Sequence, residues 1–281
     1  MTDVRTLAGL EVEVVPGSTD PVLAIHGLSS NRRLWNWLRA EAPELSLIAP
    51  DLRGRGGSVA VGGPSSVARH AQDMVAVLDE LGLESVTVCG MSMGGFVAVA
   101  LATAHPSRVR DVVLVDGGFP MAVHEGMTAD GVRAAFTAQA ARVDRAFADV
   151  EEYADFVLPG MPLLDRHDPL LRDYLAHDLA GGRVRLDPDV LVADATDTVL
   201  GPSRWRELDR PTRLVHAQWS TGPDSPPAYP PERVAQFAAG LPALQATELV
   251  EGVDHAASIM TRRGAAVLAR HLSAVLAPSA G

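Results

Sequence analysis

Short apolar runs alternate along most of the chain with longer segments whose apolar residues have helical spacing. The short runs are rich in Val, Ile and Leu and end at turn residues, which is typical of buried strands. They predict strands at Leu10–Val15, Val22–Ile25, Ser46–Ala49, Ser85–Cys89, Val112–Asp116, Arg213–Ala217 and Ala246–Val250. The periodic segments predict helices at Leu34–Ala40, Ser65–Leu81, Gly95–Ala104 and Gly264–Leu276. This alternation predicts an α/β fold with a doubly wound, mostly parallel sheet and helices on both faces.

The alternation stops after the strand that ends at Asp116. From Phe119 to Arg210 no strand-like run occurs, and the pattern is helical and rich in Ala and Arg. Prolines interrupt it, among them Pro159, Pro162, Pro169 and Pro188. We therefore expect a core formed by residues 1–117 and 211–281, with a helical segment, residues 118–210, inserted between two core strands.

The net charge of the chain limits the kinds of partner that it is expected to bind. The 281 residues carry 24 Arg, no Lys and 35 acidic side chains, which gives a net charge of −11 at pH 7. Such a charge argues against nucleic acid or an anionic membrane surface as a partner. The single cysteine, Cys89, cannot form an internal disulfide, and we find neither a signal-peptide pattern nor a bilayer-spanning apolar run. These features predict a soluble cytoplasmic protein and leave its oligomeric state open.

The most specific motif is Gly90-Met91-Ser92-Met93-Gly94, between a predicted strand and a predicted helix. Glycine on each side of Ser92 lets two backbones approach and permits a strained turn that exposes the hydroxyl. The start of the next helix offers free N–H groups and partial positive charge, which favour an oxyanion. The motif resembles the Gly-x-Ser-x-Gly nucleophile elbow of the α/β-hydrolase superfamily, and the flanking elements disfavour the alternative of a surface turn. The resemblance implies that Ser92 is a nucleophile and that residues 118–210 form a helical cap over the site.

A serine hydroxyl needs a base, and in this superfamily the order along the chain is Ser, acid, His. His255 occupies the expected place, because it follows the last predicted strand and precedes the last predicted helix. From a loop at that point it can reach Ser92. The other histidines fit structural or surface roles: His216 lies in a strand, His70 and His105 lie on helices, and His124, His167 and His177 occupy surface positions of the cap.

The oxyanion hole has a candidate in the early segment Ala24-Ile25-His26-Gly27-Leu28. The resemblance implies that the residue after His-Gly and the residue after the nucleophile donate backbone N–H groups. These are Leu28 and Met93, and their side chains would make an acyl pocket apolar. We expect His26 to brace the loop without a proton-transfer role.

The acid that orients His255 has two candidates. Most relatives carry it shortly after the next-to-last strand, where this chain has Ser220. Asp224 follows four residues later, in a proline-rich loop. Asp116, at the end of the strand after the elbow, is the position that some α/β-hydrolases use instead, and we favour it over Asp224. Asp254 neighbours His255 but points away from it in any standard geometry.

Two further segments carry charge without an expected role in catalysis. Pro50-Asp51-Leu52-Arg53-Gly54-Arg55-Gly56 resembles the Asp-x-Arg-Gly-x-Gly turn of the superfamily, which is mainly structural there. Asp165-Arg166-His167-Asp168 matches no standard metal-site spacing, so we expect a solvated turn and no metal. No phosphate-binding motif is present in the sequence, and we expect no cofactor.

The resemblance covers the chain outside the cap, and the stretch from Val113 to Pro120 together with Tyr229-Pro230 is similar to an actinobacterial subgroup of hydrolases. It implies a serine hydrolase that cleaves an ester or related acyl bond of a small, largely apolar substrate. Thioesters, lactones and C–C bonds remain open as substrates. A cofactor-free perhydrolase, similar to haloperoxidases, would use the same residues. A ligand-binding protein on the same fold is the other class, favoured by the missing acid at position 220.

Overall fold

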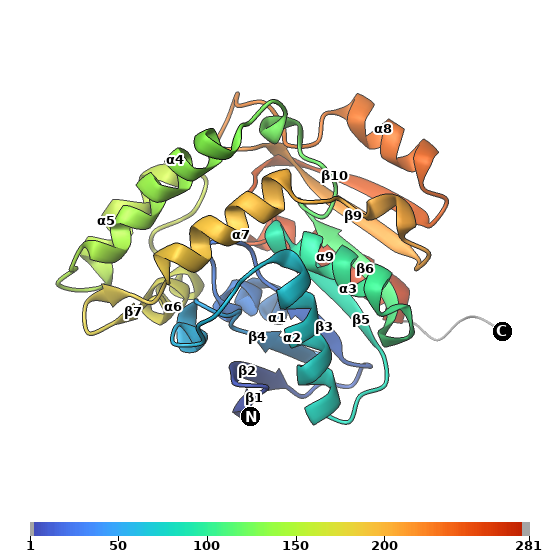
Figure 1. Cartoon of the computed structure of the whole chain (residues 1–281), viewed down its shortest axis with the longest axis horizontal. Helices are drawn as coiled ribbons and strands as arrows, with labels where there is room; N and C mark the ends of the chain where they lie inside the picture. The colour runs from blue at the N-terminus through green and yellow to red at the C-terminus, as the bar shows by residue number, and fades with distance from the viewer. Residues whose placement is uncertain (1–2, 277–281) are drawn as a thin grey trace.

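The computed structural model describes residues 3–276, except for the side chains of residues 138, 139 and 141 (Figure 1). Within these residues an eight-stranded sheet has the spatial order β1-β2-β4-β3-β5-β6-β9-β10. The strands are β1 (Asp3–Leu7), β2 (Leu10–Val15), β3 (Val22–Ile25), β4 (Leu47–Pro50), β5 (Val86–Met91), β6 (Val109–Val115), β9 (Thr212–Trp219) and β10 (Leu244–Asp254). Strand β2 runs opposite to the other strands and pairs antiparallel with β1 and β4, and all other pairs are parallel. The predicted α/β class and mostly parallel sheet are confirmed.

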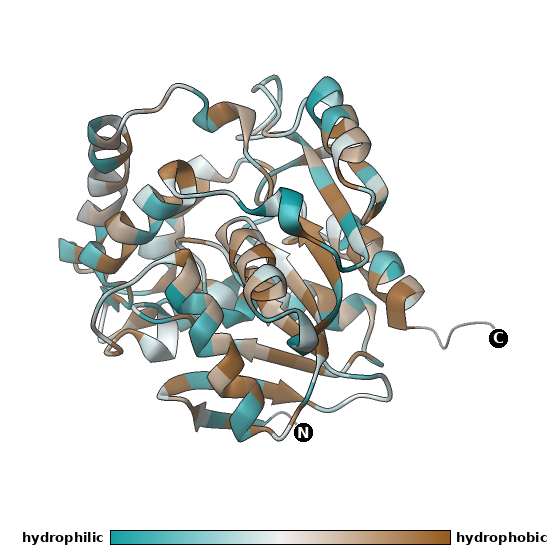
Figure 2. Cartoon of the chain, turned by 45° about the vertical axis from the view of Figure 1, so that its right-hand side comes forward, coloured by the Kyte–Doolittle hydropathy of each residue, from teal (hydrophilic) through white to brown (hydrophobic). Residues whose placement is uncertain are grey.

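Helices cover both faces of the sheet. They are α1 (Asn36–Glu41), α2 (Val67–Glu80), α3 (Met93–Ala104), α8 (Pro231–Gly240) and α9 (Arg262–Leu276). Successive side chains of a strand point to opposite faces. In β6, Leu114 shares one buried cluster with α2, α3 and α8, whereas Val115 shares another with α1 and α9. Figure 2 shows the central strands largely hydrophobic, while the edge strands and the outer helices carry both kinds of residue. The core is therefore two apolar layers separated by the sheet.

The sequence pattern does not predict β1 or α8, for different reasons. Strand β1 lies at the edge of the sheet and exposes four of its five residues, so it has no buried apolar run to detect. Helix α8 begins at Pro231, the last residue of a proline-rich stretch that reads as a loop. The predicted helix at Leu34–Ala40 is in fact a 3-10 turn, Arg32–Trp35, that continues into α1.

The segment between β6 and β9 is mostly helical. It contains α4 (Ala129–Ala140), α5 (Val150–Val157), α6 (Pro169–His177) and α7 (Pro188–Leu200), which Figure 1 shows grouped outside the sheet. Pro169 and Pro188 begin helices rather than ending them, because Asp168 and Asp187 cap the helices just before each proline. The division of the chain into a core and a cap stays a prediction.

The expectation that this segment has no strand is wrong at one place. A short antiparallel hairpin pairs β7 (Leu179–Ala180) with β8 (Arg183–Val184). Strands of two residues are too short to give a period-two pattern, which is the signal that sequence reading relies on. Among residues 3–276, no helix is long and apolar enough to cross a membrane.

Candidate active site

Ser92 lies at the turn between β5 and α3, in a conformation that L-residues rarely adopt. Its φ is +55° and its ψ is −122°. A Cβ at Gly94 would lie 2.0 Å from the carbonyl oxygen of Ile25, so only glycine lets α3 approach β3 this closely. A Cβ at Gly90 would meet the carbonyl oxygen of Gly94 at 2.2 Å. The glycines that predict the elbow are thus required by backbone contacts, and the strained serine is the kind of outlier that gathers at functional sites.

His255 is hydrogen-bonded to Asp116 and not to Asp224. The Nδ1 atom of His255 lies 2.6 Å from Oδ2 of Asp116, whose carboxylate is fully buried after β6. The other oxygen, Oδ1, accepts a hydrogen bond from the backbone N–H of Ala217 at 3.0 Å. Asp224 is exposed in its loop, and Asp254 accepts N–H bonds from Gly222 and Ala257. Of the candidate acids, the geometry favours Asp116.

The carboxylate of Asp116 changes the proton affinity of His255. Burial of the ring among neighbouring atoms opposes its charging, but the hydrogen bond and the negative charge of Asp116, with Asp254 adding to them, outweigh burial. The pKa of His255 is therefore raised above its ordinary value of 6.5. Because Nδ1 faces Asp116, Nε2 is the nitrogen left to exchange a proton with another group.

Ser92 and His255 line the same cavity, but no hydrogen bond joins them in this structure. Catalytic hydrogen bonds are often long or misaligned before a substrate binds. Ser92 and His255 thus share one cavity without a hydrogen bond between them.

The two residues predicted to donate backbone N–H groups to an oxyanion, Leu28 and Met93, line the same cavity as Ser92. Met93 is the first residue of α3, so its N–H has no partner within the helix. The N–H of Leu28 has no hydrogen bond with any residue in the described range. Both residues line the cavity.

His26 fixes the peptide group that carries the Leu28 N–H. Its Nε2 accepts from the backbone N–H of Leu52 at 3.0 Å, so Nδ1 holds the proton and donates to the Gly27 carbonyl at 2.8 Å. The C=O and N–H of a trans peptide point in opposite directions. Holding the Gly27 carbonyl therefore orients the Leu28 N–H. Burial lowers the pKa of His26 to about 3, which keeps the ring neutral.

The cavity has a volume of about 330 Å³ and is mainly apolar. Its walls come from the end of β5, from the segments that follow β6 and β9, from the loops that carry Leu28 and His255, and from helices of the inserted segment. Five methionines contribute: Met91, Met93, Met121, Met161 and Met260. None of the described lining residues is Asp, Glu or Arg. The cavity therefore fits an uncharged, apolar ligand.

Sequence reasoning misplaced His124, for which a surface position was predicted. Its ring lines the cavity, and burial together with the positive charge of His255 lowers its pKa. No pattern around Ala122–His124 marks the position, because the short 3-10 turn there is irregular. Ser220, which stands where relatives carry the acid, also lines the cavity.

His70 and His177 are likewise more buried than the sequence indicates. The Nε2 atom of His70 lies 2.8 Å from Oδ2 of Asp194 on α7, and that of His177 lies 2.8 Å from Oδ2 of Asp51. Both pairs join the helical insertion to the core. The surface role predicted for His177 is therefore wrong, and His70 has a partner that lies 124 residues away in the chain.

Arg55 connects the insertion to the loop that carries Leu28. Its Nε donates to the Leu28 carbonyl, its Nη1 to the Arg53 carbonyl, and its Nη2 lies 2.8 Å from Asp194. Arg53 in turn makes a bidentate ion pair with Asp73 at 2.7 and 2.8 Å. In this structure the charged residues of the Asp-x-Arg-Gly-x-Gly turn bind other protein groups and do not line the cavity.

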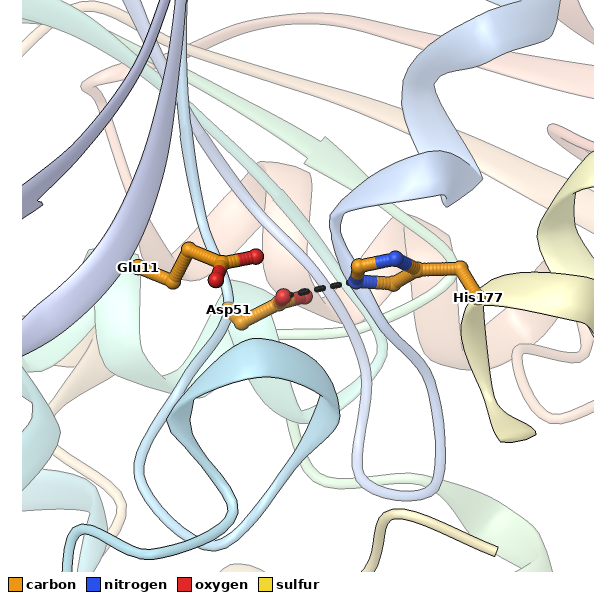
Figure 3. Close-up of side chains that lie close together, drawn as sticks. All are labelled: Glu11, Asp51 and His177. Carbon is orange, nitrogen blue, oxygen red and sulfur yellow. Dashed lines mark hydrogen bonds and ion pairs between the residues drawn. The ribbon is translucent and has the colours of Figure 1, made fainter. Parts of the chain in front are cut away.

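One cluster of side chains has the composition of a metal site. Figure 3 shows Glu11, Asp51 and His177 pointing toward one another, with their ligand atoms within 4.8 Å. The Arg32 guanidinium makes ion pairs with Glu11 at 2.5 Å and with Asp51. The positive charge of Arg32 thus already neutralises part of the charge of these carboxylates. We interpret the cluster as a structural ion-pair network.

The segment Asp165–Asp168 forms a turn and a helix cap. Asp165 accepts from the backbone N–H of His167 at 2.9 Å, and Asp168 accepts from Leu170 N–H and from Trp37 Nε1, each at 2.8 Å. The carboxylates are engaged in capping and in docking the insertion on α1.

Known proteins resemble the chain in sequence over part of its length. An uncharacterized Mycobacterium tuberculosis protein is 39% identical over 105 residues, 37% of this chain and 31% of that protein. Lipase LipV of the same organism is 39% identical over 101 residues, 36% of this chain and 38% of that protein. The alignments thus span about a third of these relatives. A putative 2-succinyl-6-hydroxy-2,4-cyclohexadiene-1-carboxylate synthase of Bacillus subtilis is 27% identical over 222 residues, covering 73% of this chain and 75% of that protein.

Solved structures agree over the whole chain. An esterase from Thermogutta terrifontis superposes with a TM-score of 0.70 at 23% identity, covering 98% of this chain and 99% of that one. The structure of E-2-(acetamidomethylene)succinate hydrolase gives a TM-score of 0.77 at 19% identity, with 99% and 100% covered. A family model described as alpha/beta hydrolase fold matches residues 20–221. The chain therefore belongs to the α/β-hydrolase fold family.

Proposed function

We propose that the protein is a serine hydrolase that cleaves a carboxylic ester, or a related acyl bond, of a small, uncharged and largely apolar substrate. The observation that carries the proposal is that one apolar cavity is lined by a strained Ser92 and by His255, which is hydrogen-bonded to Asp116. A hydroxyl needs a base, and the base needs a group that orients it and stabilises its charge. All three groups come from core loops at the carboxyl ends of parallel strands, where this type of sheet places its reactive groups.

The reaction would proceed through an acyl-enzyme. Ser92 Oγ attacks the substrate carbonyl while its proton passes to Nε2 of His255, and the N–H groups of Leu28 and Met93 stabilise the oxyanion. His255 then protonates the departing alkoxide, and the C–O bond to the alcohol breaks. Water attacks the acyl-serine and gives a proton to His255. The bond between the acyl carbon and Ser92 Oγ then breaks, His255 returns the proton to Oγ, and the acid is released. Every proton comes from Ser92, His255 or water, so these steps need no cofactor.

The lining of the cavity limits the substrate. An ester with a free carboxylate would be buried without an arginine, because none of the described lining residues is Arg, and His255 must be neutral to accept the proton of Ser92. An unpaired buried charge is costly, so such a substrate is disfavoured. The E-2-(acetamidomethylene)succinate in the name of one structural neighbour carries carboxylates. We therefore propose a neutral acyl ester, in keeping with the lipase and esterase names among the similar proteins.

A binding protein without activity is the alternative that the missing acid at position 220 favours. Asp116 supplies a carboxylate to His255 from another strand, which disfavours that alternative. A perhydrolase would use the same groups as a hydrolase, and peracid formation from acetate and hydrogen peroxide would distinguish it.

The test is the intact mass of the protein after exposure to a fluorophosphonate, with Ser92→Ala as the control. The proposal predicts one adduct on the wild type and none on the variant, followed by hydrolysis of p-nitrophenyl esters. Correctly folded wild type that gives neither adduct nor hydrolysis would contradict it and support the binding-protein alternative.

A further inference from the structure

A second cavity adjoins the active-site cavity and lies between α2, α3 and the end of α7. Its volume is about 230 Å³. Its floor is buried and apolar, formed by Ala71 of α2 and by Phe96 and Val99 of α3. Exposed residues, among them Gln72 and Arg204, form its rim. The second cavity is thus an apolar pocket with a polar mouth, and the reaction proposed above makes no use of it.

Thr198 of α7 is the residue that lines both cavities. The two cavities therefore adjoin at this residue. The other groups around them belong to one cavity or the other, so Thr198 forms the shared wall.

The hydroxyl of Thr198 is buried and has no hydrogen-bond partner among the described residues. Thr196, two residues earlier on the same helix, instead donates its hydroxyl proton to the Val192 carbonyl at 2.8 Å. Leaving a buried hydroxyl unpaired is unfavourable. A side chain held by no hydrogen bond is placed by packing alone, which is what a movable or replaceable wall requires.

We propose that Thr198 limits the length of the acyl chain that the active site accepts, and that the second cavity receives the far end of a longer chain. This inference rests on the proposed hydrolase function. An acyl chain bound at Ser92 must extend away from the polar groups into the apolar part of the cavity. That cavity lies at the small end of the range for ligand pockets, so a long chain needs further space. The apolar floor of Ala71, Phe96 and Val99 has the chemistry that such a chain needs.

The experiment measures kcat/KM for p-nitrophenyl esters from acetate to decanoate in wild type, Thr198→Ala and Thr198→Val. Alanine shortens the wall and keeps the helix, whereas valine keeps the shape and removes only the hydroxyl. For Thr198→Ala we expect the octanoate-to-butyrate ratio to rise at least tenfold, since each methylene moved from water into an apolar site is worth about fourfold. Thr198→Val should keep the wild-type chain-length profile.

A second variant tests where the longer chain goes. Ala100 of α3 is half-buried and lines the second cavity but not the first. Filling that space with Ala100→Phe in the Thr198→Ala background should return the octanoate-to-butyrate ratio to the wild-type value. Circular dichroism and the rate of fluorophosphonate labelling establish that each variant is folded and has a reactive serine.

The outcomes separate this inference from the proposed function. Wild type without labelling or ester hydrolysis would refute the function itself. An active wild type whose profile is unchanged in Thr198→Ala would overturn the role of Thr198. An equal shift in Thr198→Val would show that the hydroxyl, not the size of the wall, sets the limit. A shift that Ala100→Phe does not reverse would overturn the role of the second cavity.

Discussion

The pair His255–Asp116 and the pair His70–Asp194 look alike as local contacts but differ in their surroundings. In each, a histidine nitrogen lies within hydrogen-bonding distance of a buried carboxylate, at 2.6 Å and 2.8 Å. Asp194 also binds the Arg55 guanidinium at 2.8 Å and the Ser65 hydroxyl at 2.6 Å. Asp116 receives, besides His255, the backbone N–H of Ala217. The negative charge of Asp194 is thus shared with an arginine, while that of Asp116 is available to its histidine.

The difference decides which histidine can act as a base. The pKa of His70 is lowered, because burial outweighs the attraction of Asp194 and the charge of Arg55 opposes protonation further. The pKa of His255 is raised, because Asp116 outweighs burial. His255 also reaches the cavity, where its side chain is 31% exposed, whereas His70 is fully buried. A histidine–carboxylate contact alone therefore does not identify a catalytic pair; the other partners of the carboxylate and access to the ligand do.

The largest effect is expected from breaking the first pair. Asp116→Asn should lower kcat/KM for a p-nitrophenyl ester by about 10³- to 10⁴-fold, because an amide cannot hold the imidazole in the correct tautomer or stabilise its positive charge. The rates are measured at saturating and limiting ester. Asp224→Asn is the matched control, and a comparable loss in that variant would mean that the exposed loop supplies the acid.

Removing the arginine from the second pair should affect stability rather than chemistry. Arg55→Met leaves Asp194 buried with less compensation, and breaking such a pair costs about 3 to 5 kcal/mol of unfolding free energy. Urea unfolding measures the loss. Arg204→Met, which removes an exposed ion pair with Glu207, should shift the midpoint far less. If both variants unfold alike, Arg55 does not hold the insertion to the core.

The variant Arg55→Met also tests why the pKa of His70 differs from that of His255. Without the charge of Arg55, the pKa of His70 should rise, which histidine NMR signals report during a pH titration. In the wild type, His70 stays neutral when folded, so stability is lost as the pH falls below the unfolded value of about 6.5. A pKa of His70 that does not change in Arg55→Met would contradict this account.

A smaller effect is expected from the residue that positions the Leu28 N–H. His26→Ala should lower kcat about 10- to 100-fold and leave KM nearly unchanged, since losing an oxyanion donor altogether costs about 10²- to 10³-fold. A merely structural role would lower thermal stability without this selective loss in kcat. Thermal unfolding of the variant is therefore measured beside its kinetics.

The smallest expected effect is a shift in the pH dependence of fluorophosphonate labelling. His255 must be neutral to accept the proton of Ser92, so the rate of fluorophosphonate labelling should rise with pH through the pKa of His255. Because that pKa is raised, the acid limb should lie above pH 6.5. In Asp116→Asn the limb should move to lower pH, because only the smaller contribution of Asp254 then opposes burial. A wild-type limb below pH 6.5 would contradict the assigned pair. The pKa of His26, about 3, keeps that residue out of this range.

The sequence by itself determined the elements that repeat a buried pattern. Strands β2 and β3 have the predicted bounds, because runs such as Leu10–Val15 and Val22–Ile25 are apolar and lie between turn residues. The glycines around Ser92 also identify the elbow locally, since close backbone approach excludes any side chain there. The exposed edge strand β1 has no such pattern, and the sequence gives no sign of it.

Only the tertiary structure decided which residues meet. Asp116 and Asp224 are both plausible from their order in the chain, and the separation of 139 residues between Asp116 and His255 is closed by the parallel packing of β6, β9 and β10. His124 and His177 likewise depend on how the helical insertion folds over the core. Periodicity reports which face of an element is buried, because burial follows from local spacing. Which charged groups share that buried space depends on contacts between distant segments, and those contacts give His70 and His255 pKa shifts of opposite sign.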